Sequence, residues 1–342
     1  MTSNGDLLLV LDSASLYFRS YYALPSSMTA PDGRPHNAIR GFLTTLTRLV
    51  EAYEPTQLVA AWDVDWRPAW RVELVPSYKA HRVADDGADD DPGGIASGPG
   101  EAEPEDLGPQ AEAIAEIMDA LGIARWGASG YEADDIIGTV AARHTADALA
   151  ASQMSTDRRS TDRRSMGLCV VVSGDRDLVQ VIDPVTRLLL TVNGGMEKWP
   201  LLGVEETIDR FAVAPDQYVD MAVLRGDPSD GLPGVPGVGA KTAVALVQAF
   251  GGLDGVIGAA NEAAIARPLT PRIAERIRAC SDELHRARTV TQVVRDVPVP
   301  ALRPDIPGQP VDEQRLDALA SEWGVGRQVT DLRRALGQTV PE

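Results

Sequence analysis

The sequence predicts an α/β protein with a central, mostly parallel sheet flanked by helices, followed by a second, mostly helical domain. Over residues 1–202, short apolar runs that end in polar residues alternate with longer helical patterns, as in sheets whose strands are joined by helices. From residue 203 to residue 300, helical patterns follow one another across Gly- and Pro-rich turns without a clear strand. Residues 301–342 form a C-terminal segment with one more helix.

The composition of the chain limits the classes of protein to which it can belong. With 342 residues and 44% hydrophobic side chains, the chain can bury one large core or two smaller ones. Two cysteines and four histidines exclude a disulfide framework and disfavour a zinc site. No secretory leader and no apolar run near ~18 residues occurs, so we expect a soluble, cytoplasmic protein without a membrane partner. The net charge of −18, read alone, disfavours nucleic acid.

The first part of the chain contains the strands. Apolar runs at 7–11, 57–62 and 168–172 are predicted as buried parallel strands. Asp12, Asp63 and Asp175 follow their ends. Because parallel strands end at one edge of a sheet, where ligands bind in such folds, we expect these aspartates to lie close together. Helical patterns connect the strands at 38–53, 108–121 and 133–150.

The second part is helical and the first part carries two inserts. Helices are predicted at 207–211, 215–224, 242–250, 270–287 and 312–336. Residues 83–106 hold nine carboxylates and no Lys or Arg, which predicts a disordered loop. Residues 155–165 repeat a pentapeptide and are predicted as a surface insertion. Half of the net charge therefore belongs to one loop.

Nine acidic residues form the candidate site. They are Asp12, Asp63, Glu132, Asp134, Asp135, Asp175, Asp177, Asp227 and Asp230. Each alone has a structural explanation, as a turn residue or as an acid in the first turn of a helix. Together they would repel one another without cations, and an oxygen-only set selects Mg²⁺ or Mn²⁺. Their number exceeds the needs of one octahedral ion, which favours a two-metal site for phosphodiester hydrolysis.

A basic segment follows Asp63. We expect this segment, which carries Arg67, Arg71, Lys79 and Arg82, to hold a scissile phosphate by charge. Arg71 and Tyr78 are expected to contact the DNA, Tyr78 by stacking on a base. The alternative for this segment is a solvated helix face.

A glycine-rich turn lies at residues 232–243. One residue separates Gly239 from Lys241, so the spacing of a P-loop is not met. We predict a hairpin that opens a helix, in which the backbone at Gly237 and Gly239, with Lys241 and Thr242, contacts a DNA phosphate. A purely structural helix–turn–helix junction is the alternative.

Four motifs in one order identify a family. YKAHR, YEADDIIG, SGDRDL and GDPSDGLPGVPGVGAKTA together resemble the bacterial and phage 5′ nucleases, the flap endonuclease/5′–3′ exonuclease family that includes the N-terminal domain of bacterial DNA polymerase I. The resemblance runs from residue 7 to about residue 336. It implies a PIN-like nuclease domain followed by a helix–three-turn–helix (helix-hairpin-helix-like) DNA-binding domain. We expect a stand-alone enzyme, because no polymerase or proofreading domain is present in the sequence.

The resemblance also implies roles for individual residues. Asp12, Asp63, Glu132, Asp134 and Asp135 fall on the family's first metal cluster, and the other four acids fall on the second. Lys79 matches an arch lysine that contacts the scissile phosphate, and Arg82 its basic companion. The turn at Val235 and Val238 resembles a loop whose backbone carbonyls bind potassium.

The implied activity is structure-specific hydrolysis of DNA with a 5′ flap, gap or nick, or of an RNA primer, in replication and repair. Two or three Mg²⁺ or Mn²⁺ ions and a monomeric protein are expected. A non-catalytic DNA-junction binder and an RNA-directed PIN nuclease are the alternatives. Three features depart from the family pattern: Gly231 replaces the usual Asn, one extra residue lies between Asp63 and Tyr78, and the acidic insert 83–106 occupies the arch region.

Overall fold

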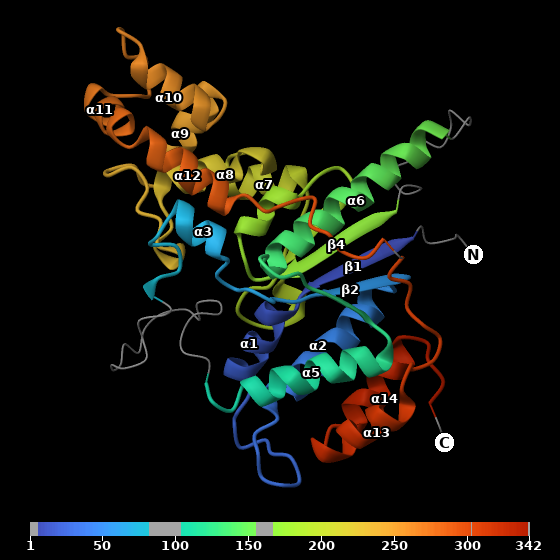
Figure 1. Ribbon diagram of the computed structural model, residues 1–342. Helices are drawn as coiled ribbons and strands as arrows, with labels where there is room; N and C mark the ends of the chain where they lie inside the picture. The colour runs from blue at the N-terminus through green and yellow to red at the C-terminus, as the bar shows by residue number, and fades with distance from the viewer. Residues whose placement is uncertain (1–5, 82–103, 155–166, 302, 341–342) are drawn as a thin grey trace.

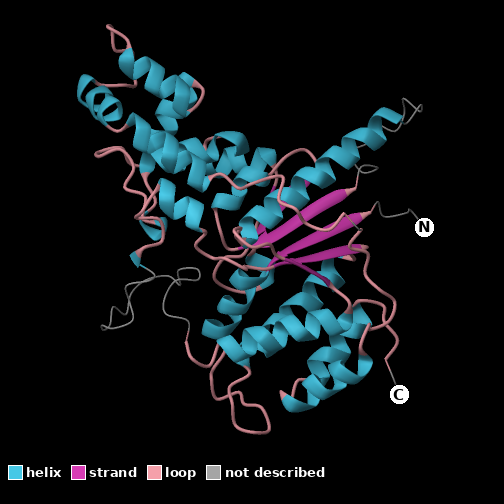
Figure 2. Ribbon diagram, in the orientation of Figure 1, coloured by secondary structure: helices cyan, strands magenta, loops and turns pink. Residues whose placement is uncertain are grey.

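A six-stranded sheet forms the centre of the protein (Figure 1). The computed structural model describes residues 6–81, 104–154, 167–301 and 303–340. The strand order is β3-β2-β1-β4-β5-β6, and every neighbouring pair is parallel except β5 and β6. Helices cover both faces of the sheet (Figure 2). The predicted fold class is confirmed.

Three strands coincide with the predicted apolar runs. They are β1 (Leu7–Asp12), β2 (Gln57–Ala61) and β4 (Leu168–Ser173). The sequence pattern missed three others, which are β3 (Ala124–Trp126), β5 (Thr186–Leu190) and β6 (Leu201–Leu202). Two of these are only two or three residues long, too short to show a strand pattern.

Alternate residues of each strand enter two different cores, as the two-residue period of a strand requires. Leu8 and Val10 face α6 (Ala133–Met154) and the helical domain, while Leu9 and Leu11 face α2 (Asn37–Tyr53) and α5 (Gly108–Leu121). The helical domain therefore shares its core with one face of the sheet.

The helical domain contains six α-helices among the described residues. They are α7 (Val204–Phe211), α8 (Tyr218–Arg225), α9 (Ala240–Phe250), α10 (Leu253–Asn261), α11 (Pro271–Ala279) and α12 (Ser281–Thr291). The helix predicted at 270–287 is thus two helices, which are separated at Cys280, and α10 was not predicted. Within the described ranges, no single helix is long and apolar enough to cross a membrane; the bent pair α9 and α10 passes that test together.

The C-terminal segment returns to the face of the sheet opposite the helical domain. The single helix predicted at 312–336 is two helices, α13 (Glu313–Glu322) and α14 (Gly326–Ala335). Gly324, at φ +63°, ends the first of them, a conformation that glycine adopts without strain. In Figure 1 both helices lie beside α2 and α5, and their side chains join the core on that side.

Several predictions concern residues outside the described ranges. Arg82, residues 83–103 of the acidic insert and the insertion at 155–165 belong to this group. The last three residues of the acidic insert are described, and they form the turn that leads into α5. There, the Tyr21 hydroxyl on α1 (Ser13–Ala23) donates a hydrogen bond of 2.7 Å to Asp106.

Candidate active site

A cavity of about 1920 Å³ opens at the carboxyl ends of the parallel strands, where the sequence predicted the site. Eight of the nine predicted acids line it. They are Asp12, Asp63, Glu132, Asp134, Asp175, Asp177, Asp227 and Asp230. Lys79 lines the same cavity, whereas Asp135 does not. The fold therefore gathers acids from both domains at one place.

Asp12 is held at the end of β1, where it also caps α1. Its carboxylate accepts hydrogen bonds from the backbone N–H of Ser15 at 3.0 Å and from the Ser173 hydroxyl at 2.5 Å. The same Ser173 hydroxyl accepts from the backbone N–H of Asp175 at 2.9 Å. One serine at the end of β4 thus fixes acids that follow two neighbouring strands.

Glu132 is buried just before α6 and contacts three side chains of the basic segment. One carboxylate oxygen accepts from the Tyr78 hydroxyl at 2.9 Å and lies 3.1 Å from the Arg71 guanidinium. The other lies 2.5 Å from the Lys79 ammonium. Nearby, Asp63 accepts from the backbone N–H of Ala133 at 2.8 Å. Both acids are thereby anchored at the start of α6.

Asp135 is fully buried and its carboxylate is already occupied. The Arg71 guanidinium donates to both of its oxygens, at 2.8 and 2.7 Å. The backbone N–H groups of Glu132 and Val294 donate to the same carboxylate, at 3.1 and 2.8 Å. Asp135 therefore fits an anchor beneath the site better than a direct metal ligand.

Two residues predicted to contact DNA are instead buried. Arg71 on α3 (Ala69–Leu74) is only 2% exposed, because Asp135 neutralises it inside the protein. The ring of Tyr78 is 3% exposed and packs against Leu232 and Val290 of the helical domain. Neither side chain reaches the surface in this structure, and both hold the basic segment against the second domain.

The second group of acids lies between β4 and the helical domain. The backbone N–H of Asp177 donates to Asp175 at 2.7 Å. Asp227 accepts from the backbone N–H of Ser229 at 3.0 Å and lies 3.3 Å from the Arg225 guanidinium. The carbonyl of Asp230 accepts from the backbone N–H of Lys79 at 3.0 Å. This last bond joins the second group to the lysine of the first.

Burial and mutual repulsion shift the titration of several of these acids. Burial, reinforced by the charges of Asp63 and Asp175, raises the pKa of Asp12 to about 7. Burial also raises the pKa of Asp63, and it raises the pKa values of Asp134 and Asp177 well above their usual range, with Asp175 adding repulsion to both. Burial and like charges thus outweigh the hydrogen bonds that favour the charged carboxylates.

For Lys79, in contrast, the surroundings favour the charged form of the side chain. Burial alone would lower the pKa of its ammonium group, but the charge of Glu132 raises it well above the ordinary value. The residue also has an unusual backbone, with φ +49°. The backbone bond to Asp230 stabilises this left-handed conformation. Lys79 is thus a charged group at neutral pH and is fixed at the edge of the acidic cavity.

The donor set fits a hard divalent cation. It consists of carboxylates without His or Cys, and the raised pKa values indicate repulsion that a cation would relieve. Among the described residues, no three acids already surround a single ion position. The acids that best fit this role have either a raised pKa or an exposed carboxylate. They are Asp12, Asp63, Asp134, Asp175 and Asp177.

The predicted DNA contacts of the glycine-rich turn lie at the surface. Gly239 and Lys241 are exposed at the start of α9, and no side chain caps that helix. Thr242 lies beside them, half-buried. Gly237 is exposed with φ +81°. This turn leaves backbone N–H groups and a lysine at the surface, and their contact with a DNA phosphate stays a prediction.

The two valines of the same turn have different surroundings. Both side chains are buried, and the Val235 carbonyl accepts from the backbone N–H of Val238 at 2.9 Å. Arg276 on α11, which the sequence did not single out, donates to the Pro236 carbonyl at 2.6 Å. A cationic side chain therefore already contacts one carbonyl of this turn.

Gly231 is a second residue that the sequence marked only as a departure from the family pattern. It has φ +71°, and a Cβ at this position would lie 2.0 Å from the Ser77 carbonyl oxygen. Ser77 also donates to the Gly231 carbonyl at 2.8 Å. Glycine is required because the turn that carries Lys79 passes directly against it.

The fold and the acidic site define a class of protein: a nuclease with a resolvase-like (PIN-like) domain and an appended helical domain. Residues 7–212 match the 5′–3′ exonuclease N-terminal resolvase-like domain, and residues 213–314 match the 5′–3′ exonuclease C-terminal SAM fold. The chain belongs to the 5′–3′ exonuclease family. The family predicted from the four sequence motifs is therefore confirmed.

Two full-length relatives support the same assignment. The chain is 43% identical over 331 residues to a 5′–3′ exonuclease of Streptomyces coelicolor, covering 96% of this chain and 99% of that protein. It is 40% identical over 342 residues to a 5′–3′ exonuclease of Mycobacterium tuberculosis, covering 98% of each. A DNA polymerase I of Mycobacterium bovis is 31% identical over 314 residues, but the match covers only 30% of that protein.

Solved structures agree with the fold. T5 5′-exonuclease with bound zinc superposes with a TM-score of 0.59 at 15% identity, covering 96% of this chain and 99% of that one. The catalytic core of Rad2 in complex with DNA substrate superposes with a TM-score of 0.56 at 13% identity, covering 98% of this chain and 94% of that one. At these identities the likeness concerns the fold.

Proposed function

We propose that this protein is a structure-specific, metal-dependent 5′ nuclease that hydrolyses phosphodiesters at junctions between single-stranded and duplex DNA. It acts as a 5′–3′ exonuclease and flap endonuclease. The observation that carries the proposal is the convergence of eight acids and one charged lysine on one cavity. The family and its full-length relatives named 5′–3′ exonuclease support the same activity.

Two divalent ions, Mg²⁺ or Mn²⁺, would supply a hydroxide nucleophile and stabilise the departing 3′-oxygen when bound. Asp12, Asp63 and Asp134 would hold one ion, and Asp175, Asp177, Asp227 and Asp230 would hold the other. Glu132 acts differently, because it positions the Lys79 ammonium at 2.5 Å.

Lys79 contributes to the transition state. Its fixed charge offsets the charge that develops on the transferring phosphate, an effect that is strong in a partly dry cavity. A substrate phosphate would compete with Glu132 for this ammonium group. Arg82 follows three residues further along the chain and is not among the described residues. In this proposal it supports the same phosphate.

The helical domain would hold the duplex. The exposed start of α9 presents Lys241 and free backbone N–H groups, which suit phosphate contacts without sequence readout. A potassium ion at the carbonyls of Val235 and Val238 would add a bridge to the duplex. In this proposal the protein works as a monomer in the bacterial cytoplasm, in primer removal and repair.

The test is cleavage of a 5′-labelled flap, with nicked and gapped duplexes beside it, in Mg²⁺, Mn²⁺ or EDTA. Metal-dependent release of 5′ products supports the proposal. Tight binding of flap DNA without cleavage in any metal would instead indicate a non-catalytic junction binder. Faster cleavage of a matched single-stranded RNA than of the DNA flap would indicate an RNA-directed nuclease.

A further inference from the structure

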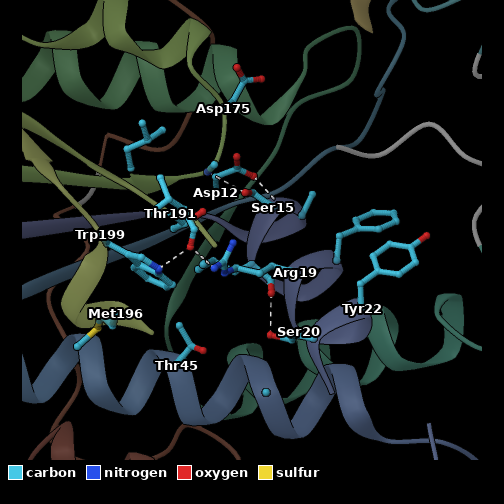
Figure 3. Close-up of a pocket in the computed structure, with 18 of the residues that line it drawn as sticks. Asp12, Ser15, Arg19, Ser20, Tyr22, Thr45, Asp175, Thr191, Met196 and Trp199 are labelled. Carbon is cyan, nitrogen blue, oxygen red and sulfur yellow. Dashed lines mark hydrogen bonds between the residues drawn. The ribbon is translucent and has the colours of Figure 1, made fainter. Parts of the chain in front are cut away.

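The cavity extends well beyond the acidic residues. From Asp12 and Asp175 it continues along α1 and α2 to the loop 191–199 and to α14. Figure 3 shows this part, with Arg19 between Asp12 and Thr45 of α2, and Trp199 beside it. It lies on the face of the sheet opposite the helical domain, because α2 and α14 belong to the core on that side.

This second part of the cavity is basic, in contrast to the first. We call it the arginine arm, and it is lined by Arg19, Arg40, Arg48, Arg327 and Arg334. Two acids, Glu51 and Asp331, line the same region. Asp331 lies 3.6 Å from Arg327 and 3.4 Å from Arg334. The arm therefore keeps a surplus of positive charge in a protein whose formal net charge is −18.

Arg40 and Arg48 carry most of that surplus. Both are exposed on α2, and the described residues offer neither side chain a hydrogen bond or ion pair. They lie eight positions apart with Thr44 midway, so all three share one helix face. That spacing corresponds to about 12 Å along the helix axis. Two free guanidinium groups in line suit an extended polyanion better than a small anion.

Close packing holds this face in place. A Cβ at Gly41 of α2 would lie 2.6 Å from the Ser20 Cβ of α1, so the two helices touch at the floor of the arm. Across the arm, Arg327 and Arg334 lie seven positions apart on α14, which packs against α2 through buried Val329 and Leu332. The two arginine rows are thus carried by rigid, mutually packed helices.

Arg19 connects the arm to the acidic site. Its guanidinium lies 5.2 Å from the centre of the Trp199 ring and donates to the carbonyls of Val192 and Gly194. These contacts fix a half-buried charge between the carboxylates and the α2 arginines. A strand that leaves the acidic site along this route would pass Arg19 on its way to Arg40 and Arg48.

We infer that the arginine arm binds the phosphate backbone of the DNA that continues past the scissile phosphate on the side away from the helical domain. This inference rests on the proposed function, because it takes the scissile phosphate to lie at the acidic site. The arm offers guanidinium groups on helix faces, which suit phosphates and carry no base readout. It therefore contributes affinity and orientation, not sequence preference.

The test uses the double variant Arg40→Gln/Arg48→Gln. Both side chains are exposed, so the fold is expected to tolerate the change. The matched control is Arg303→Gln, because Arg303 is 64% exposed and pairs with Asp6 at the opposite end of the strands. Dissociation constants for flap DNA are measured in EDTA over a series of salt concentrations, so that binding is separated from cleavage.

We expect the double variant to bind flap DNA about tenfold more weakly at moderate salt. The slope of its log affinity against log salt should also become shallower by about 1.4 to 1.8, which is the value for two lost phosphate contacts. The difference in affinity between the double variant and the unmodified protein should vanish when the DNA on the side away from the helical domain is shortened. It should persist when the duplex held by the helical domain is shortened instead. Supplying the far side as duplex or as single strand identifies which form is bound.

A slope equal to that of the Arg303→Gln control would overturn the inference. So would a loss of affinity that is the same on substrates with and without the far-side DNA. Cleavage of the labelled flap by the unmodified protein is recorded in parallel. Its absence would contradict the proposed function, while the salt slopes would still decide whether the arm binds DNA.

Discussion

The ammonium group of Lys79 lies 2.5 Å from a carboxylate oxygen of Glu132, at the edge of the acidic cavity. The pair joins the two halves of the molecule, because Lys79 also bonds through its backbone to Asp230 of the helical domain. A charge placed in this way can act on a substrate phosphate only if the phosphate displaces or shares Glu132.

Lys79→Ala should lower kcat by roughly 10²- to 10³-fold, the usual effect of removing one preorganised electrostatic group. Affinity for flap DNA in EDTA should change far less, because other groups hold the duplex. Single-turnover cleavage and binding measured together check this. Lys198→Ala, at an exposed lysine that does not line the cavity, is the control. Equal kcat in both variants would contradict the role of Lys79.

Lys241→Ala should weaken DNA binding and leave the cleavage step unchanged, which is the reverse of the effect expected for Lys79→Ala. Its exposed side chain at the start of α9 is expected to meet a duplex phosphate. The variant should bind flap DNA more weakly, with a salt slope lower by about 0.9. Cleavage of bound substrate should keep the rate of the unmodified protein. A large fall in single-turnover rate at saturating enzyme would place Lys241 in the chemistry instead.

Arg71→Ala should destabilise the protein. The buried guanidinium neutralises Asp135 and Glu132, and removing one partner of a buried ion pair costs about 3–5 kcal/mol. Arg315→Ala is the control, because its pair with Glu116 is exposed and is expected to contribute about 1 kcal/mol or less. Urea unfolding of both variants tests the difference. Similar midpoints would show that Arg71 is not a structural anchor.

Gly231→Ala should cost about 1–3 kcal/mol and lower kcat. The added Cβ would meet the Ser77 carbonyl oxygen at 2.0 Å, and the strained backbone favours glycine. The turn that carries Lys79 would have to move. Gly258→Ala, in α10 with open space around the new Cβ, should be neutral or stabilising. Unchanged stability and kcat in Gly231→Ala would show that this contact is easily relaxed.

The stability of the metal-free protein should depend on pH through Asp12. Its pKa is raised from 3.8 to about 7, so between these values the folded state binds a proton that the unfolded state has lost. The free energy of unfolding therefore falls as pH rises through this window. Asp12→Asn lacks this effect and should gain stability relative to the unmodified protein from pH 4 to pH 7. A difference independent of pH would contradict the raised pKa.

Much of the site could be predicted because its signals are local. Asp12, Asp63 and Asp175 follow apolar runs that mark buried strands, and parallel strands bring such ends together. The start of α9 is equally visible, since Gly239 and Lys241 stand at the opening of an apolar helical pattern. The order of strands and helices in the first domain follows from the same periodicity.

The errors concern contacts that no local pattern reveals. Arg71 was expected at the surface, but its partner Asp135 lies 64 positions away in the sequence. Tyr78 is buried by Leu232 and Val290, which belong to the other domain. In each case tertiary packing decides what the residue does.

Metal-dependent cleavage is tested most directly by comparing the unmodified protein with Asp175→Asn on one 5′-labelled flap DNA. Asn keeps the oxygen that accepts from the Asp177 backbone N–H, while it removes the charge needed to hold a divalent ion. We predict metal-dependent cleavage by the unmodified protein, and in the variant a loss of cleavage with nearly unchanged binding in EDTA. Full cleavage by Asp175→Asn, or no cleavage by the unmodified protein in Mg²⁺ or Mn²⁺, would contradict the account.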